Sequence, residues 1–219
     1  MESTTGLILH SPEGVAYRFD PGALCLELLP TGGPGAYARY EIMRAPADLA
    51  AWVGSCRLQP PPEIVVSEED VAGARRLRDA LWRLAADRAH GRPPRPADLA
   101  VVNEAAAAPP LAPVLTAGGE RGWHWPATAS QLLSTVARDA VELFSGPYAD
   151  RIRECGADDC YLLFVDTSRP GRRRWCSMQR CGNRHKVRAL RARQADGAPG
   201  PEEPAGGRGG APGGERGAE

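Results

Sequence analysis

Hydrophobic and polar positions follow a helical period through much of the first 146 residues. Between residues 71 and 85 the apolar residues recur at intervals of three and four, as on one face of an amphipathic helix. Ser67 precedes this stretch and can cap the helix, and three carboxylates follow it in the first turn, where they complement the helix dipole. Related patterns predict helices that begin at Pro46, at Pro96 and after Thr128, the last with a capping box.

Charged residues occupy the other face of the helix that follows Ser67. Arg75, Arg76, Arg78 and Asp79 fall between its apolar positions. Charged side chains are rarely buried in folded proteins, so we expect this face to be exposed to water.

Short alternating stretches lie between the helices. Residues 7–19 predict a hairpin, because apolar residues alternate after a turn signal at 11–14. Residues 111–125 predict two strands around a glycine turn, and residues 22–29 form a compact apolar segment that we expect to be buried. The fold class is therefore α+β, with a mainly helical N-terminal domain that carries short β-hairpins.

Four of the six cysteines lie in one short segment and form two C-x4-C pairs separated by fifteen residues: Cys155, Cys160, Cys176 and Cys181. Two thiolate pairs across a hairpin-sized gap can bind one tetrahedral zinc ion, and four protein ligands leave no open position, so the ion would be structural. Two disulfides are an alternative, although nothing indicates secretion and cytosolic thiols stay reduced. His185 is an alternative fourth ligand. Cys25 and Cys56 have no partner at metal spacing, and we expect them in the core.

The residues around these cysteines predict a β-hairpin followed by a helix. Residues 161–166 are apolar and β-prone, residues 167–171 are a turn signal, and residues 173–176 can return as the second strand. After Cys181 the chain is expected to form a short helix, with Val187 and Leu190 facing inward.

Positive charge is concentrated in the same segment. Residues 151–193 carry a net charge of +8, whereas the whole chain is formally neutral. Arginine is always charged and its fork of donors suits phosphate, so we expect this segment to bind nucleic acid, DNA above all. The candidate contacts are Arg172, Arg173, Arg174, Asn183, Arg184, Lys186, Arg188 and Arg191. Asn183 or Arg184 could reach a base edge, and Asn183 could equally cap the helix.

Three other interpretations remain open for the basic segment. It could bind RNA, it could dock on an acidic protein partner, or its arginines could form a solvated face that pairs with the acidic remainder of the chain. Homodimerisation is compatible with the sequence, and the sequence does not name a small-molecule effector.

Two stretches of the sequence resemble known families. The run Cys181-Gly182-Asn183-Arg184, preceded by Arg-Arg-Trp-Cys at 173–176, resembles the CGNR zinc finger. Gly-Ala-Leu-Cys-Leu-Glu-Leu-Leu at 22–29 resembles the ABATE domain that usually precedes this finger. The resemblance implies a bacterial, stress-induced transcription regulator. The chain departs from the family at Pro30, where an Asn-Thr pair is usual.

We expect an ABATE-like domain over residues 1–146, acting as a sensor or dimerisation unit, and a zinc finger over residues 147–193. Residues 194–219 are Gly, Pro, Ala and Glu almost throughout, which predicts a disordered tail. No phosphate loop, nucleophile elbow or metallohydrolase motif is present, so we do not expect an enzyme. The chain has no apolar run of membrane-spanning length and no signal-peptide pattern at its start, which predicts a cytoplasmic protein.

Overall fold

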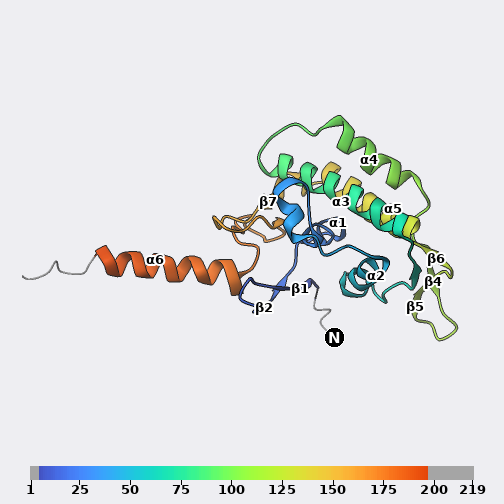
Figure 1. Cartoon of the computed structure of the whole chain (residues 1–219), viewed down its shortest axis with the longest axis horizontal. Helices are drawn as coiled ribbons and strands as arrows, with labels where there is room; N and C mark the ends of the chain where they lie inside the picture. The colour runs from blue at the N-terminus through green and yellow to red at the C-terminus, as the bar shows by residue number, and fades with distance from the viewer. Residues whose placement is uncertain (1–4, 197–219) are drawn as a thin grey trace, which may run out of the picture. The chain divides into compact units, whose positions relative to one another are not determined.

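The computed structural model describes residues 5–196 of the chain (Figure 1). The chain divides into two compact units between His185 and Lys186, within helix α6 (Asn183–Asp196). The helix predicted after Cys181 is thus present, and it includes the first three residues of the predicted tail. Residues 197–219 of that tail lie outside the described residues.

Helices α3 (Glu68–Ala89), α4 (Pro96–Ala107) and α5 (Ala129–Ser145) pack against one another and form the largest part of the first unit (Figure 1). The short buried helix α1 (Leu24–Glu27) and helix α2 (Pro46–Ser55) contribute to the same hydrophobic core. The described residues of this unit also contain three short 3-10 helices: η1 (Leu29–Thr31), η2 (Gly35–Tyr40) and η3 (Ala149–Arg151).

Side-chain caps fix where the two longest helices begin. The Ser67 hydroxyl accepts a hydrogen bond from the Asp70 amide at 3.2 Å, and the Thr128 hydroxyl accepts one from the Gln131 amide at 3.2 Å. In each case the side chain at the third helical position accepts a hydrogen bond from the backbone amide of the cap residue, which completes a capping box. The predicted starts of these helices are confirmed.

Residues 5–196 contain four two-stranded sheets, and two of them are the hairpins predicted at residues 7–19 and 111–125. These two hairpins are the antiparallel pairs of β1 (Leu7–His10) with β2 (Ala16–Phe19), and of β4 (Pro113–Leu115) with β5 (Arg121–Trp123). The parallel pair is β3 (Ile64–Val65) with β6 (Ala127–Thr128).

The hairpin of the cysteine segment uses a different pair of strands from the predicted one. Strand β7 (Ile152–Glu154) pairs antiparallel with β8 (Leu163–Val165), whereas residues 173–176 form no strand. The Asp166 carboxylate explains the difference, because it accepts the Arg173 amide at 2.8 Å and the Ser168 amide at 3.0 Å. These bonds hold the chain in a wide turn after β8, and the Arg173 amide is not available to a β ladder.

A second, smaller cluster of buried residues surrounds the four clustered cysteines. Tyr17 and Phe19 of β2 and Phe164 of β8 belong to it, and Phe19 and Phe164 are fully buried. The N-terminal hairpin therefore packs into the cysteine cluster, although 135 residues separate Phe19 from Cys155. Contacts thus cross the domain boundary predicted at residue 146. Cys25 and Cys56 lie in the larger core, as predicted.

The prediction that the polar face of α3 is solvated is wrong for Arg78. The residue is only 1% exposed. Its guanidinium donates to the two carboxylate oxygens of Glu41 at 2.8 and 2.7 Å and to the carbonyl of Thr31 at 3.4 Å. The segment from η1 to Glu41 covers this part of the helix and supplies the acceptors, so the charge is buried with partners.

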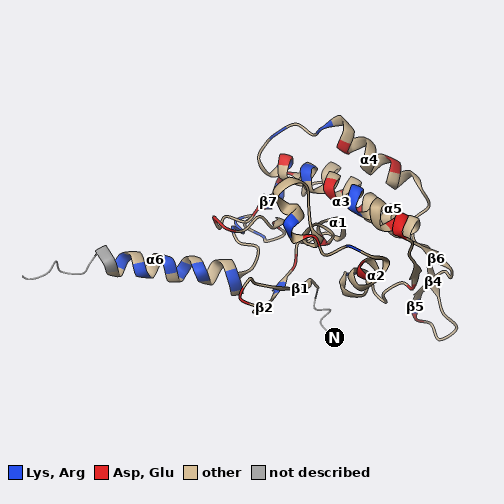
Figure 2. Ribbon diagram, in the orientation of Figure 1, with Lys and Arg blue, Asp and Glu red and all other residues tan. Residues whose placement is uncertain are grey.

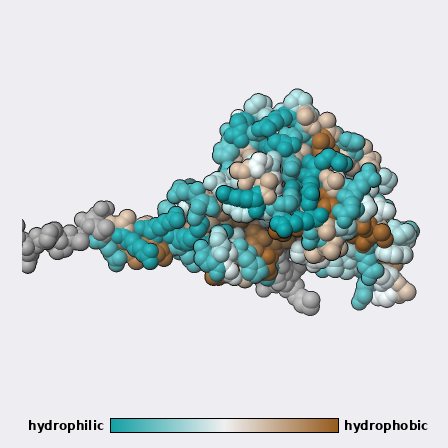
Figure 3. Space-filling view, in the orientation of Figure 1, coloured by the Kyte–Doolittle hydropathy of each residue, from teal (hydrophilic) through white to brown (hydrophobic). Residues whose placement is uncertain are grey.

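The face of the molecule drawn in Figure 3 is mostly hydrophilic and carries small hydrophobic areas. Among residues 5–196, no helix is both long enough and apolar enough to cross a lipid bilayer.

Candidate metal centre

The loop between β7 and β8 and a short helical turn bring the four clustered cysteines together. Cys155 follows β7 directly, and its amide donates to the Leu162 carbonyl at 3.0 Å across the hairpin. Cys160 ends a turn, and its backbone amide closes the turn by donating a hydrogen bond to the Ala157 carbonyl, also at 3.0 Å. The π-helical turn η4 (Met178–Gly182) carries Cys181 back towards Cys176. Backbone hydrogen bonds therefore place Cys155 and Cys160, and η4 places Cys181.

The distances between the sulfur atoms suit one tetrahedral ion. All four Sγ atoms lie within 4.8 Å of one another, and the thiols are buried. The Sγ atoms of Cys160 and Cys176 are 3.6 Å apart, and those of Cys176 and Cys181 are 3.5 Å apart. A tetrahedron with zinc–sulfur bonds of about 2.3 Å has edges of about 3.8 Å. The four cysteines are thus able to hold one zinc ion with little movement.

The clustered thiols share their protons through hydrogen bonds to one another. Hydrogen bonds from the thiols of Cys160 and Cys176 lower the pKa of Cys155, and the Cys176 amide donates to the same sulfur at 3.4 Å. The pKa values of Cys160 and Cys176 are raised, because their protons are held in bonds to neighbouring sulfur atoms. Thiol ligands must lose their protons to bind a metal, and a divalent ion stabilises the resulting thiolates.

Arg173 lies inside this module. Its guanidinium donates to the backbone carbonyls of Trp175 and Asp20, both at 3.0 Å, and to that of Cys176. The guanidinium carbon also lies 4.1 Å from the centre of the Phe164 ring. Arg173 thus ties the turn before Cys176 to the segment that follows the N-terminal hairpin.

Arg184 connects the two cysteine loops. Its terminal nitrogens donate to the two carboxylate oxygens of Asp159 at 2.8 and 2.7 Å, and one of them also lies 3.5 Å from the Cys181 sulfur. Asp159 stands directly before Cys160, whereas Arg184 follows Cys181 by three residues. The pair therefore joins the first loop to the second around the four sulfur atoms, as groups behind metal ligands commonly do.

Two family models cover this chain. Residues 22–147 match the ABATE family, whose description is "Putative stress-induced transcription regulator". The chain belongs to the ABATE family. Residues 151–194 match the CGNR zinc finger, so the four cysteines lie within the matched segment. Both descriptions name a regulator or a zinc finger, not an enzyme. No curated protein is similar enough to the chain to count as a match.

The basic residues of the CGNR finger fall into two groups. Arg173 and Arg184 are partly buried in the contacts described above. The side chains of the other candidate residues are exposed: Arg172, Arg174, Asn183, Lys186, Arg188 and Arg191. Figure 2 shows that Lys and Arg residues recur along α6. Sequence reasoning could not separate the two groups, because only the fold reveals which guanidinium has acceptors nearby.

The structure also describes three further residues of the CGNR finger that the sequence singled out. The ring of His185 packs on Trp175, with ring centres 4.7 Å apart, and among the described residues the cluster of possible metal ligands contains cysteines alone. Val187 and Leu190, predicted to face inward, are 46% and 49% exposed. A helix with so few apolar residues has no continuous hydrophobic stripe to bury.

Proposed function

We propose that this ABATE-family protein is a DNA-binding transcription regulator whose finger is stabilised by one structural zinc ion. The observation that carries the proposal is a compact four-thiol site in a segment that has a net charge of +8 and exposes most of its candidate basic side chains. The finger corresponds to residues 147–193. The domain before it, residues 1–146, would act as a sensor or as a dimerisation unit.

The zinc ion would act by holding the finger together. Metal binding supplies about 10–16 kcal/mol to small zinc modules, which seldom fold without it. The Arg173 contacts and the Arg184–Asp159 pair would then fix the two cysteine loops, and neither guanidinium would be needed for phosphate. The exposed residues Arg172, Arg174 and those of α6 would make the phosphate contacts.

Two exposed groups would contribute separately to DNA affinity. Arg172 and Arg174 lie on the turn before Cys176, and Lys186, Arg188 and Arg191 lie on α6. Each phosphate contact lowers the slope of log affinity against log salt concentration by about 0.9. Replacement of either group by glutamine should therefore make the slope shallower by about 2 to 3 and weaken binding to every DNA sequence.

The test is a gel-shift titration of the zinc-loaded protein on duplex DNA and on RNA at several salt concentrations. Arg121→Gln is the matched control, because Arg121 is an exposed arginine on β5 outside the finger. DNA binding that keeps its salt slope in both sets of glutamine variants would contradict the proposal. Tighter binding to RNA than to DNA would favour the RNA interpretation instead.

A further inference from the structure

A cleft of about 290 Å³ lies between helices α3, α4 and α5, away from the metal centre. Its floor is apolar and buried and includes Leu84, Val102 and Ala140, one residue from each helix. Leu99 and Val141 also line it and are 40% and 42% exposed, so the apolar surface continues to the opening. A concave apolar site with a few polar groups is the usual form of a small-molecule pocket.

Two arginines line the same cleft. Arg92 donates from its Nε to the Asp87 carboxylate at 2.7 Å, and its side chain is 52% exposed. Arg88 donates from its Nε to the Ala149 carbonyl at 3.3 Å, and one terminal nitrogen lies 3.5 Å from Asp150, which is 91% exposed. Within residues 5–196, both guanidinium groups keep N–H donors beyond these bonds. They offer a binding site for an anion at the edge of an apolar cleft.

We propose that this cleft binds a small amphipathic carboxylate, with an apolar body in the cleft and the carboxylate on Arg88 and Arg92. An engineered apolar cavity of 150 Å³ holds benzene, so by proportion this cleft would hold roughly a dozen non-hydrogen atoms. The ligand would be the signal that the N-terminal domain senses. That regulatory role rests on the proposed function, whereas binding itself does not.

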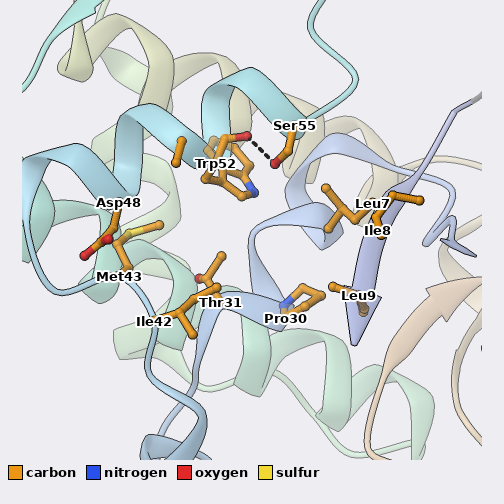
Figure 4. A pocket seen from close by; sticks show the side chains of 11 residues that line it. Leu7, Ile8, Leu9, Pro30, Thr31, Ile42, Met43, Asp48, Trp52 and Ser55 are labelled. Atoms are coloured by element: carbon orange, nitrogen blue, oxygen red, sulfur yellow. Dashed lines mark hydrogen bonds between the residues drawn. The ribbon is translucent and has the colours of Figure 1, made fainter. Parts of the chain in front are cut away.

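A second cavity lacks the arginines of this cleft and serves as a comparison for anion binding. It has a volume of about 260 Å³ and lies between β1, the Pro30–Thr31 turn and α2 (Figure 4). Its lining is also mainly apolar but contains no basic residue, and its one ionisable group, Asp48, accepts the Arg44 and Ala45 amides. This cavity would not select an anion, so a preference for carboxylates would point to the cleft with the arginines.

The position of Arg88 links the cleft to the finger. Its acceptors Ala149 and Asp150 belong to η3, and β7 begins directly afterwards at Ile152 and leads to Cys155. A bound carboxylate would compete with Asp150 for Arg88. The contact between α3 and the start of the finger would thus depend on whether the ligand is bound.

Two-dimensional NMR titration of the zinc-loaded full chain, without DNA, tests the proposal with octanoate and its neutral counterpart octan-1-ol. We expect octanoate to bind at least tenfold more tightly than the alcohol and to shift signals from α3, α4 and α5. In Arg88→Gln and Arg92→Gln the ratio of the affinity for octanoate to the affinity for octan-1-ol should fall towards one, while the affinity for octan-1-ol stays the same. Arg76→Gln, an exposed arginine of α3 outside the cleft, should behave as the natural protein.

Val141→Trp provides a second test, because a larger side chain at this half-exposed position fills the cleft without burying a polar group. Both ligands should lose binding in this variant. The proposal is overturned if the natural protein binds octanoate and the alcohol equally, if it binds no octanoate at millimolar concentration, or if both glutamine variants keep the preference. None of these results depends on DNA binding, so failure here leaves the proposed DNA function standing.

Discussion

The ion pair between Arg184 and Asp159 makes it possible to test whether Arg184 stabilises the finger or contacts DNA. Arg184 is one of the candidate DNA contacts in the sequence, whereas in the structure it joins the two cysteine loops. If the pair stabilises the metal-bound fold, its loss should weaken zinc binding, because zinc binding and folding of the module are coupled.

The size of the effect follows from the geometry of the pair. Both bonds are short, at 2.8 and 2.7 Å, but the side chains of Arg184 and Asp159 are 32% and 49% exposed, so solvent screens the attraction. The Nε of Arg184 is buried and has no hydrogen-bond partner among the described residues, which reduces the net gain. We therefore expect a coupling energy of about 1 kcal/mol, or about fivefold in zinc affinity.

A double-mutant cycle measures this coupling. Zinc affinities of Arg184→Ala, Asp159→Ala and the double variant are obtained by competition with a chromophoric chelator at fixed pH. Arg184→Ala should have the larger effect, of about tenfold, because it also removes the N–H next to the Cys181 sulfur. Arg174→Ala is the control, since its exposed guanidinium lies over the Trp175 ring, 5.2 Å from the ring centre.

Zinc affinity that is unchanged in Arg184→Ala, together with no measurable coupling to Asp159, would refute this reasoning. If the same variant then lost DNA affinity, Arg184 would have the phosphate role that its sequence position first suggested.

Three further predictions concern stability. Phe19→Ala should weaken zinc-dependent folding of the finger by about 3 kcal/mol, since Phe19 is fully buried beside the cysteines. Val15→Ala is the control on the same hairpin, and it should change the folding free energy by less than about 0.5 kcal/mol because Val15 is exposed. Chelator titrations followed by circular dichroism compare the two variants. Arg78→Ala should lower the free energy of unfolding in urea by about 3 kcal/mol, because it breaks a buried ion pair and, within the described part of the chain, leaves the Glu41 carboxylate with only the Met43 amide at 2.9 Å and Arg75 at 3.8 Å. Arg76→Ala, on an exposed part of the same helix, should have little effect. Removal of zinc should unfold the finger and leave the helical circular dichroism signal of α3, α4 and α5 largely intact. If the helical signal is lost to the same extent as the structure of the finger, the two cores fold as one unit.

Local signals in the sequence were sufficient for the starts of α3 and α5 and for the four cysteines that lie together in the structure. Ser67 and Thr128 lie next to periodic apolar runs, and a cap depends only on residues three positions away. The two C-x4-C pairs likewise identify the thiols, because the loop between paired ligands is short.

Interactions between distant parts of the chain could not be predicted in the same way. The pairing of β8 with β7 and the burial of Arg78 by the segment near Glu41 depend on which segments meet in space. The same holds for Phe19, which lies far from the cysteines in sequence yet packs beside them. A single sequence carries the propensity of each segment but no record of its partner.

X-ray absorption at the zinc edge, combined with metal analysis of the reduced protein, shows whether four thiolates hold one zinc ion. We expect one zinc per chain with four sulfur neighbours at about 2.3 Å. Fewer than four sulfur neighbours, or a protein that is fully folded with well under one zinc per chain, would contradict this expectation.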